Sequence, residues 1–134
     1  MNISNVMGDG IYIAVINPVK TDGKINIVNN VIENCRRNGI SIIHGKNITI
    51  KNNTIRYTHG TWPQVGIDLE RNLTEQVYEN VLIESNSIYG NEAHYSIQIF
   101  PGIKGFLKII NNHLGDRVVA FDDSRHPELP VEKN

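Results

Sequence analysis

The chain has 134 residues, a formal net charge of −1 at pH 7 and a pI near 6.5. This length allows one domain with a modest core, and the near-neutral charge gives no basic field for nucleic acid or an anionic membrane surface. No apolar run is long enough to cross a bilayer, the first residues lack the features of a signal peptide, and the lone Cys35 has no disulfide partner within the chain.

In chain order, a first short strand is expected at residues 10–13 (GIYI), before an eight-residue pattern that recurs four times. The pattern reads apolar-x-apolar-x-Asn/Ser-Asn-x-apolar and occupies residues 25–32, 48–55, 81–88 and 107–114. Its copies start 23, 33 and 26 residues apart. A second strand follows each copy, at residues 39–42, 66–69, 96–99 and 118–121. Alternating apolar and polar residues indicate β-strands, and repeats of this length predict a solenoid.

Each copy of the pattern has asparagine at the same position, namely Asn30, Asn53, Asn86 and Asn112. A sandwich of hairpins gives no reason for this, whereas stacked coils let side-chain amides hydrogen-bond from one rung to the next. The same asparagines are expected to adopt the left-handed conformation that turns the chain between two sheets. The sequence therefore favours an all-β, right-handed parallel β-helix of about four to five rungs.

The repeats are expected over residues 1–121, with a C-terminal tail or cap at residues 122–134. The first rung starts half-made and no capping helix precedes it, although a solenoid needs its terminal rungs covered. We therefore expect a piece of a longer helix, or a subunit whose ends are covered by association.

The repeated strands resemble those of the pectate-lyase-like superfamily over about residues 10–121. That superfamily includes pectinases, alginate epimerases, and phage tailspikes or neck appendages that cut polysaccharide. The resemblance implies an extracellular or virion-associated protein whose partner is a polysaccharide or oligosaccharide, and a homo-oligomer (a trimer by analogy with tailspikes). The motif sets of polygalacturonases, alginate epimerases and pectate lyases are missing, and the fold hosts several chemistries, so no particular reaction is implied.

The alternation also predicts which side chains fill the coil. One aliphatic column is expected from the repeated pattern and two more from the second strand. The predicted columns are Ile27, Ile50, Ile83 and Ile109; Ile40, Ile67, Ile97 and Val119; and Ile42, Leu69, Ile99 and Phe121.

Function is then expected on the outward positions of the second strand. One outward column reads Tyr12, Ser41, Asp68, Gln98 and Ala120, and its neighbour reads Ala14, Ile43, Glu70, Phe100 and Asp122. Asp68 and Glu70 point to the same side, with Asp122 on the order of 10 Å away. Paired carboxylates at such separations suit glycoside hydrolysis. The alternative is that they are solvated charges on an exposed sheet face.

The turn between the first and second strands of the second repeat, residues 56–65 (RYTHGTWPQV), contains the only tryptophan of the chain. Trp62 is expected either to cover a sugar ring, together with Phe100, or to pack beneath its own loop. Tyr12 and Gln98 are further candidates for substrate binding. His59 is either a general acid or base or a surface residue, and Arg71 could contact an anionic sugar. The histidines show no metal-ligand spacing, so neither a metal nor another cofactor is predicted.

Two functions remain open from the sequence. The first is a polysaccharide-processing enzyme, a glycoside hydrolase or lyase such as a phage or prophage depolymerase. The second is a non-catalytic structural or glycan-binding module of a tail fibre or surface protein.

Overall fold

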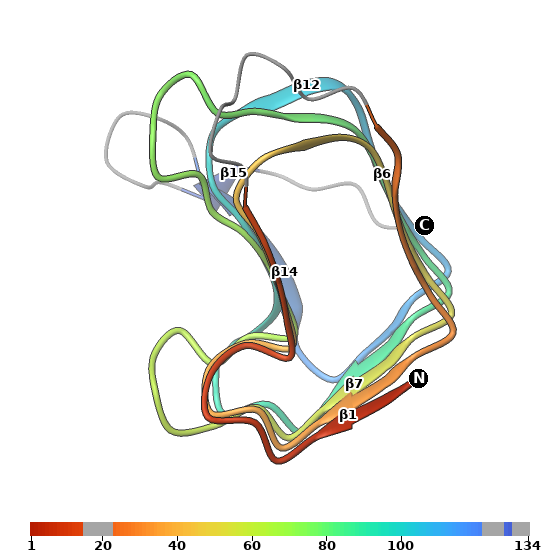
Figure 1. The fold of residues 1–134 in the computed structure, drawn as a ribbon, viewed down its shortest axis with the longest axis vertical. Coiled ribbons are helices and arrows are strands. Elements are labelled where there is room, and N and C mark those ends of the chain that lie inside the picture. The colour runs from red at the N-terminus through yellow and green to blue at the C-terminus, as the bar shows by residue number, and fades with distance from the viewer. Residues whose placement is uncertain (15–22, 122–127, 130–134) are drawn as a thin grey trace.

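The computed structural model describes residues 1–14, 23–121 and 128–129, which form a β-coil without helices. Figure 1, viewed along the coil, shows strands stacked into three walls. Sheet A contains β1 (Asn2–Ser4), β4 (Val31–Glu33), β7 (Thr54–Arg56), β10 (Ser87–Tyr89) and β13 (His113–Leu114). Sheet B contains β2 (Ile11–Ile13), β5 (Ile40–Ile42), β8 (Ile67–Leu69), β11 (Tyr95–Ile99), β14 (Arg117–Phe121) and β15 (Glu128–Leu129). Sheet C contains β3 (Ile25–Val28), β6 (Gly45–Lys51), β9 (Tyr78–Glu84) and β12 (Ile103–Ile110).

Neighbouring strands come from successive rungs and pair in parallel, which confirms the predicted parallel β-helix of four to five rungs. The exception is β15, which pairs antiparallel with β14. The eight-residue pattern covers two strands, because each copy runs along sheet C, turns at the Asn pair and continues in sheet A. No helix among the described residues is long and apolar enough to span a membrane.

The asparagine ladder is present at the corner between sheets C and A. Asn30 Nδ2 donates to Asn53 Oδ1 (2.9 Å), Asn53 Nδ2 to Asn86 Oδ1 (3.0 Å), and Asn86 Nδ2 to Asn112 Oδ1 (3.0 Å). The backbone N–H of each donor residue bonds to the same oxygen, so each rung is tied twice to the next.

The expectation that these ladder asparagines also adopt the left-handed conformation is wrong. The positive φ angles belong to the preceding residues, Asn29 (59°), Asn52 (54°), Ser85 (56°) and Asn111 (55°). One residue of each pair therefore turns the chain while the next bonds between rungs. A single residue need not satisfy both requirements.

The interior of the coil is aliphatic, as predicted. Ile27, Ile50, Ile83 and Ile109 are aligned by strand pairing and are at most 6% exposed. Together with the inward residues of sheets A and B they make one continuous core. Hydrophobic burial along this core is the main force that holds the rungs in a stack.

In the last rung the predicted register is wrong by one residue. Gln98 pairs with Val119, and Ile99 with Ala120, so Val118 and Ala120 enter the core at the levels of Ile97 and Ile99, where Val119 and Phe121 were predicted. A register shift between Tyr95 and Ile97 accompanies this pairing.

Candidate acidic site on sheet B

The outward column of sheet B is polar but buried. Ser41, Asp68 and Gln98 are aligned by the pairing of β5, β8 and β11, and each is only 1–2% exposed. They alternate along their strands with core isoleucines and leucines, so they point out of the coil, as predicted. They are not the solvated side chains of an open sheet face.

Asn38, just before β5, connects this column. Its Nδ2 donates to Ser41 Oγ (3.0 Å) and to Asp68 Oδ2 (3.0 Å), and its Oδ1 accepts from the backbone N–H of Val65 (3.1 Å). Gln98 Nε2 donates to the other oxygen of Asp68 (3.3 Å). Asn38 is fully buried and was not predicted, because it lies outside the repeated strand patterns; its only sequence signal is its place before Gly39.

The carboxyl group of Asp68 lies beside that of Glu70, and the two are hydrogen-bonded. Burial, followed by the charge and the hydrogen bond of Glu70, raises the pKa of Asp68 to about 8, and Gln98 and Arg37 oppose this rise. The folded chain therefore keeps a proton on Asp68 at a higher pH than an ordinary aspartate would. Glu70 is partly exposed, whereas Asp68 is 1% exposed, so Glu70 is the member of the pair that a ligand can reach.

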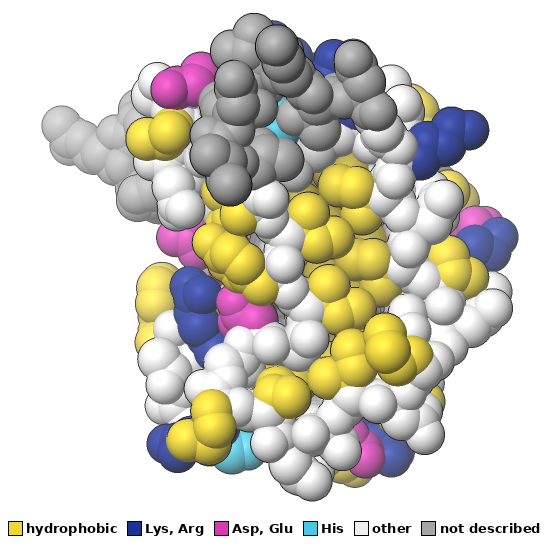
Figure 2. Space-filling model, in the orientation of Figure 1, with side chains coloured by type: hydrophobic (Ala, Val, Ile, Leu, Met, Phe, Trp, Pro, Cys, Tyr) yellow, Lys and Arg dark blue, Asp and Glu magenta, His cyan; other side chains and the backbone are white. Residues whose placement is uncertain are grey.

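Two loops of one rung flank β8. Loop 57–66 leads into the strand and loop 70–77 leads out of it, and in Figure 1 both project outward from the ends of sheet B on the same side. The outline in Figure 2 is notched between them, with acidic and basic side chains gathered there. We call the outer face of sheet B between these loops the sheet-B recess. The second repeat is the longest because both of these loops are long.

Trp62 is 70% exposed in loop 57–66, so it does not pack beneath its own loop. The loop is held by the next rung, because Glu92 Oε2 accepts bonds from the backbone N–H of Gly60 (3.2 Å) and from Gln64 Nε2 (2.9 Å). The opposite loop exposes Leu73 (51%). Each loop beside the recess thus presents a large apolar side chain to solvent.

Arg71, Tyr12 and Phe100 were also predicted to bind substrate. Arg71 Nη1 donates to the carbonyls of Thr74 (2.8 Å) and Gln76 (3.4 Å), so it folds its own loop. Tyr12 is 53% exposed on β2 and Phe100 is partly exposed after β11.

His59 lines a separate hollow of about 190 Å³ with Arg36 and Met7. Asp122 lies outside the described residues, and among the described ones no three His, Cys, Asp or Glu side chains form a metal-binding group.

The architecture and this site define a β-helix with a buried aspartate and a partly exposed glutamate side by side on one sheet. A family model described as right handed beta helix region matches residues 1–124, and the chain belongs to this family. No curated protein and no solved structure matched the chain in the corresponding searches.

Proposed function

We propose that the protein binds a polysaccharide or oligosaccharide in the sheet-B recess and cleaves it with Glu70 as the acid–base group. The observation that carries this proposal is the adjacent carboxyl pair of Asp68, on β8 and with a raised pKa, and Glu70, directly after β8. The pair lies between two loops of the same rung. Carboxyl groups with raised pKa values are typical of sites that transfer protons near neutral pH.

The burial of Asp68 separates the roles of the two carboxyl groups. Glu70 contacts the sugar, and Asp68 is a positioning residue that holds a proton behind it. Hydrogen-bonded carboxyls are closer together than the roughly 5–9.5 Å that separates the two groups of most glycosidases. The pair therefore acts as one unit on one side of the scissile bond, and any second catalytic group comes from elsewhere.

The loops supply surfaces suited to sugar. The flat ring of Trp62 covers the C–H face of a pyranose, while the carboxylate of Glu70 binds hydroxyl groups. The proposal includes an extracellular or virion-associated location and a homotrimeric assembly. Both rest on the resemblance to tailspikes.

A second candidate function is a non-catalytic glycan-binding or structural module. The observation that favours it is the saturation of Asp68, whose two oxygens accept bonds from Asn38 and Gln98 inside a buried network. Such a network also stabilises a strand stack without any reaction. This candidate predicts binding without turnover.

The two functions are separated by an assay of new reducing ends, and of near-ultraviolet absorbance for lyase products, over a panel of acidic and neutral polysaccharides. For any polysaccharide that is cleaved, Glu70→Gln is expected to lower kcat by about 10²-fold or more, since the acid–base group is lost. Asp68→Asn is expected to move the pH profile of kcat rather than KM.

The matched control is Glu79→Gln, which removes a partly exposed carboxylate on sheet C, paired with Lys46 at 3.5 Å. It is expected to leave kcat unchanged. Glycan binding by the wild type without any product would overturn the enzymatic proposal and support the module.

A further inference from the structure

We infer that the outer face of sheet C carries a second glycan-binding site, a groove that takes a linear, uncharged oligosaccharide laid across the strands. The groove has a volume of about 320 Å³ and is lined from β3, β6, β9 and β12. Across four strands it spans on the order of 15 Å, about the length of three sugar rings. It lies on a different wall of the coil from Asp68 and Glu70 (Figure 1).

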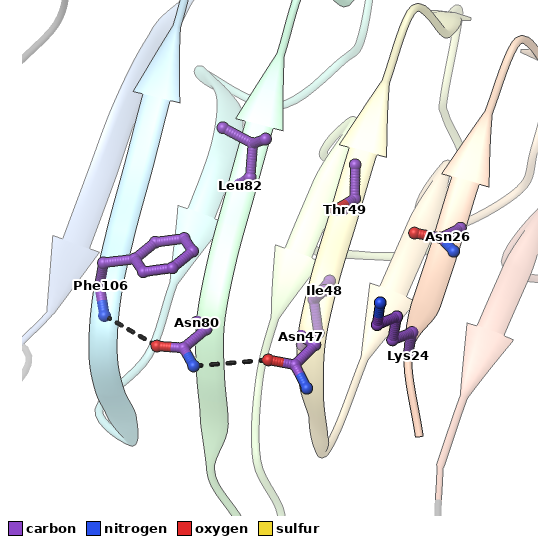
Figure 3. A pocket seen from close by; sticks show the side chains of 8 residues that line it. All are labelled: Lys24, Asn26, Asn47, Ile48, Thr49, Asn80, Leu82 and Phe106. Atoms are coloured by element: carbon purple, nitrogen blue, oxygen red, sulfur yellow. Dashed lines mark hydrogen bonds between the residues drawn. The ribbon is translucent and has the colours of Figure 1, made fainter. Parts of the chain in front are cut away.

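Side-chain amides line both sides of the groove. Figure 3 shows Asn80 and Asn47 in line along one side, with Lys24 beyond them. Asn80 Nδ2 donates to Asn47 Oδ1 at 3.4 Å. Leu82, Thr49 and Asn26 lie in a row on the other side.

Phe106 forms one end of the groove and projects toward it (Figure 3). Its ring is 44% exposed, and the Lys108 ammonium lies 5.1 Å from the ring centroid. Its backbone N–H donates to Asn80 Oδ1 at 3.3 Å. Gly105, with φ of 68°, allows this approach, because a Cβ there would collide with the Asn80 amide. The local backbone therefore fixes the aromatic ring beside the amides.

This arrangement fits a sugar chain better than a peptide strand. A peptide strand binds through the free edge of a sheet, whereas this groove crosses strands that are already paired with each other. Amides, a hydroxyl and one aromatic ring match the hydroxyl groups and C–H faces of pyranoses. Apart from Lys24, every described residue that lines the groove is neutral, so recognition rests on the amides, the hydroxyl and the ring, which suit an uncharged chain.

The test is a titration of ¹⁵N-labelled protein with cellohexaose, xylohexaose, chitohexaose and a galacturonate hexamer, followed through the side-chain amides of Asn26, Asn47 and Asn80. At least one neutral hexamer is expected to shift these signals at millimolar concentration. Phe106→Ala and Asn47→Gly are each expected to weaken its binding about fivefold, the loss of roughly 1 kcal/mol of contact. Glycine suits position 47 because φ there is 50°.

The controls are Val28→Ala, which changes an exposed apolar residue on the same sheet, and Glu70→Gln in the sheet-B recess. Both are expected to leave this binding unchanged, and the melting temperature checks that each variant is folded. The inference is overturned if no hexamer shifts the three amides. It is equally overturned if only the galacturonate hexamer does so and added salt abolishes the effect, since that would show attraction to Lys24 alone.

Discussion

At the scale of single residues, Asp68 is the most unusual side chain of the described part of the chain. It is an acidic group with almost no solvent contact, yet it lies on the outward side of its strand. Alternation predicted its direction, because Ile67 and Leu69 on either side are core residues. It could not predict its burial, which depends on Asn38 from the preceding rung and Gln98 from the following one.

This burial predicts how stability depends on pH. The pKa of Asp68 is about 8 in the folded chain, against an ordinary value of 3.8. The folded state therefore binds the proton more tightly than the unfolded state does. The free energy of unfolding is expected to fall as pH rises from about 4 to about 8, by an amount on the order of a few kcal/mol.

Urea unfolding at several pH values measures this dependence. Asp68→Asn is expected to remove most of the slope, whereas Asp116→Asn, at an exposed site, keeps it. An equal slope in the wild type and in Asp68→Asn would mean that Asp68 is charged in the folded protein.

At the scale of the element, two adjacent residues have different roles at the corner between sheets C and A. One bonds to the neighbouring rungs, and the other adopts the positive φ angle of the turn. Asn53 is 1% exposed, accepts from Asn30, and donates to Asn86 and to the carbonyl of Ile27 (2.8 Å). Asn52 is exposed and holds the positive φ. The two asparagines look alike in the sequence but are stabilised by different means.

Substitutions at the two positions are therefore expected to behave differently. Asn53→Ala should lower the free energy of unfolding by about 2–4 kcal/mol, because it leaves buried partners unpaired. Asn52→Gly should change it by less than about 1 kcal/mol, and Asn52→Ala should cost about 1–2 kcal/mol through backbone strain alone. Denaturant unfolding of the three variants measures this. A large loss of unfolding free energy in Asn52→Gly, or no loss in Asn53→Ala, would contradict these separate roles.

The spacing of the repeat was enough to predict the ladder, but not which residue turns. The third copy has Ser85 before Asn86, which marks the second position as the constant one. The last-rung register was unpredictable for another reason. Residues 118–121 are all apolar, so the polar–apolar alternation that orients β5 and β8 is missing there.

At the scale of the whole molecule, the stacked rungs form a regular scaffold. The features that distinguish one rung from another are the long loops. Both loops that border the sheet-B recess come from the same rung. The sequence drew attention to the first loop through its tryptophan, whereas loop 70–77 has no comparable aromatic signal. Both loops project on the same side because of the way the chain coils. Local sequence patterns do not predict this shared direction.

Trp62 can report directly on a glycan bound in the sheet-B recess, because it is the only tryptophan of the sequence and is 70% exposed. Fluorescence is measured while polysaccharides and oligosaccharides are titrated in. We predict a saturable blue shift of the emission, as the ring leaves water for the face of a sugar, and the same shift in Phe106→Ala. Glycan binding by Phe106→Ala, in which the sheet-C groove is weakened, that leaves the emission of Trp62 unchanged would contradict binding in the sheet-B recess.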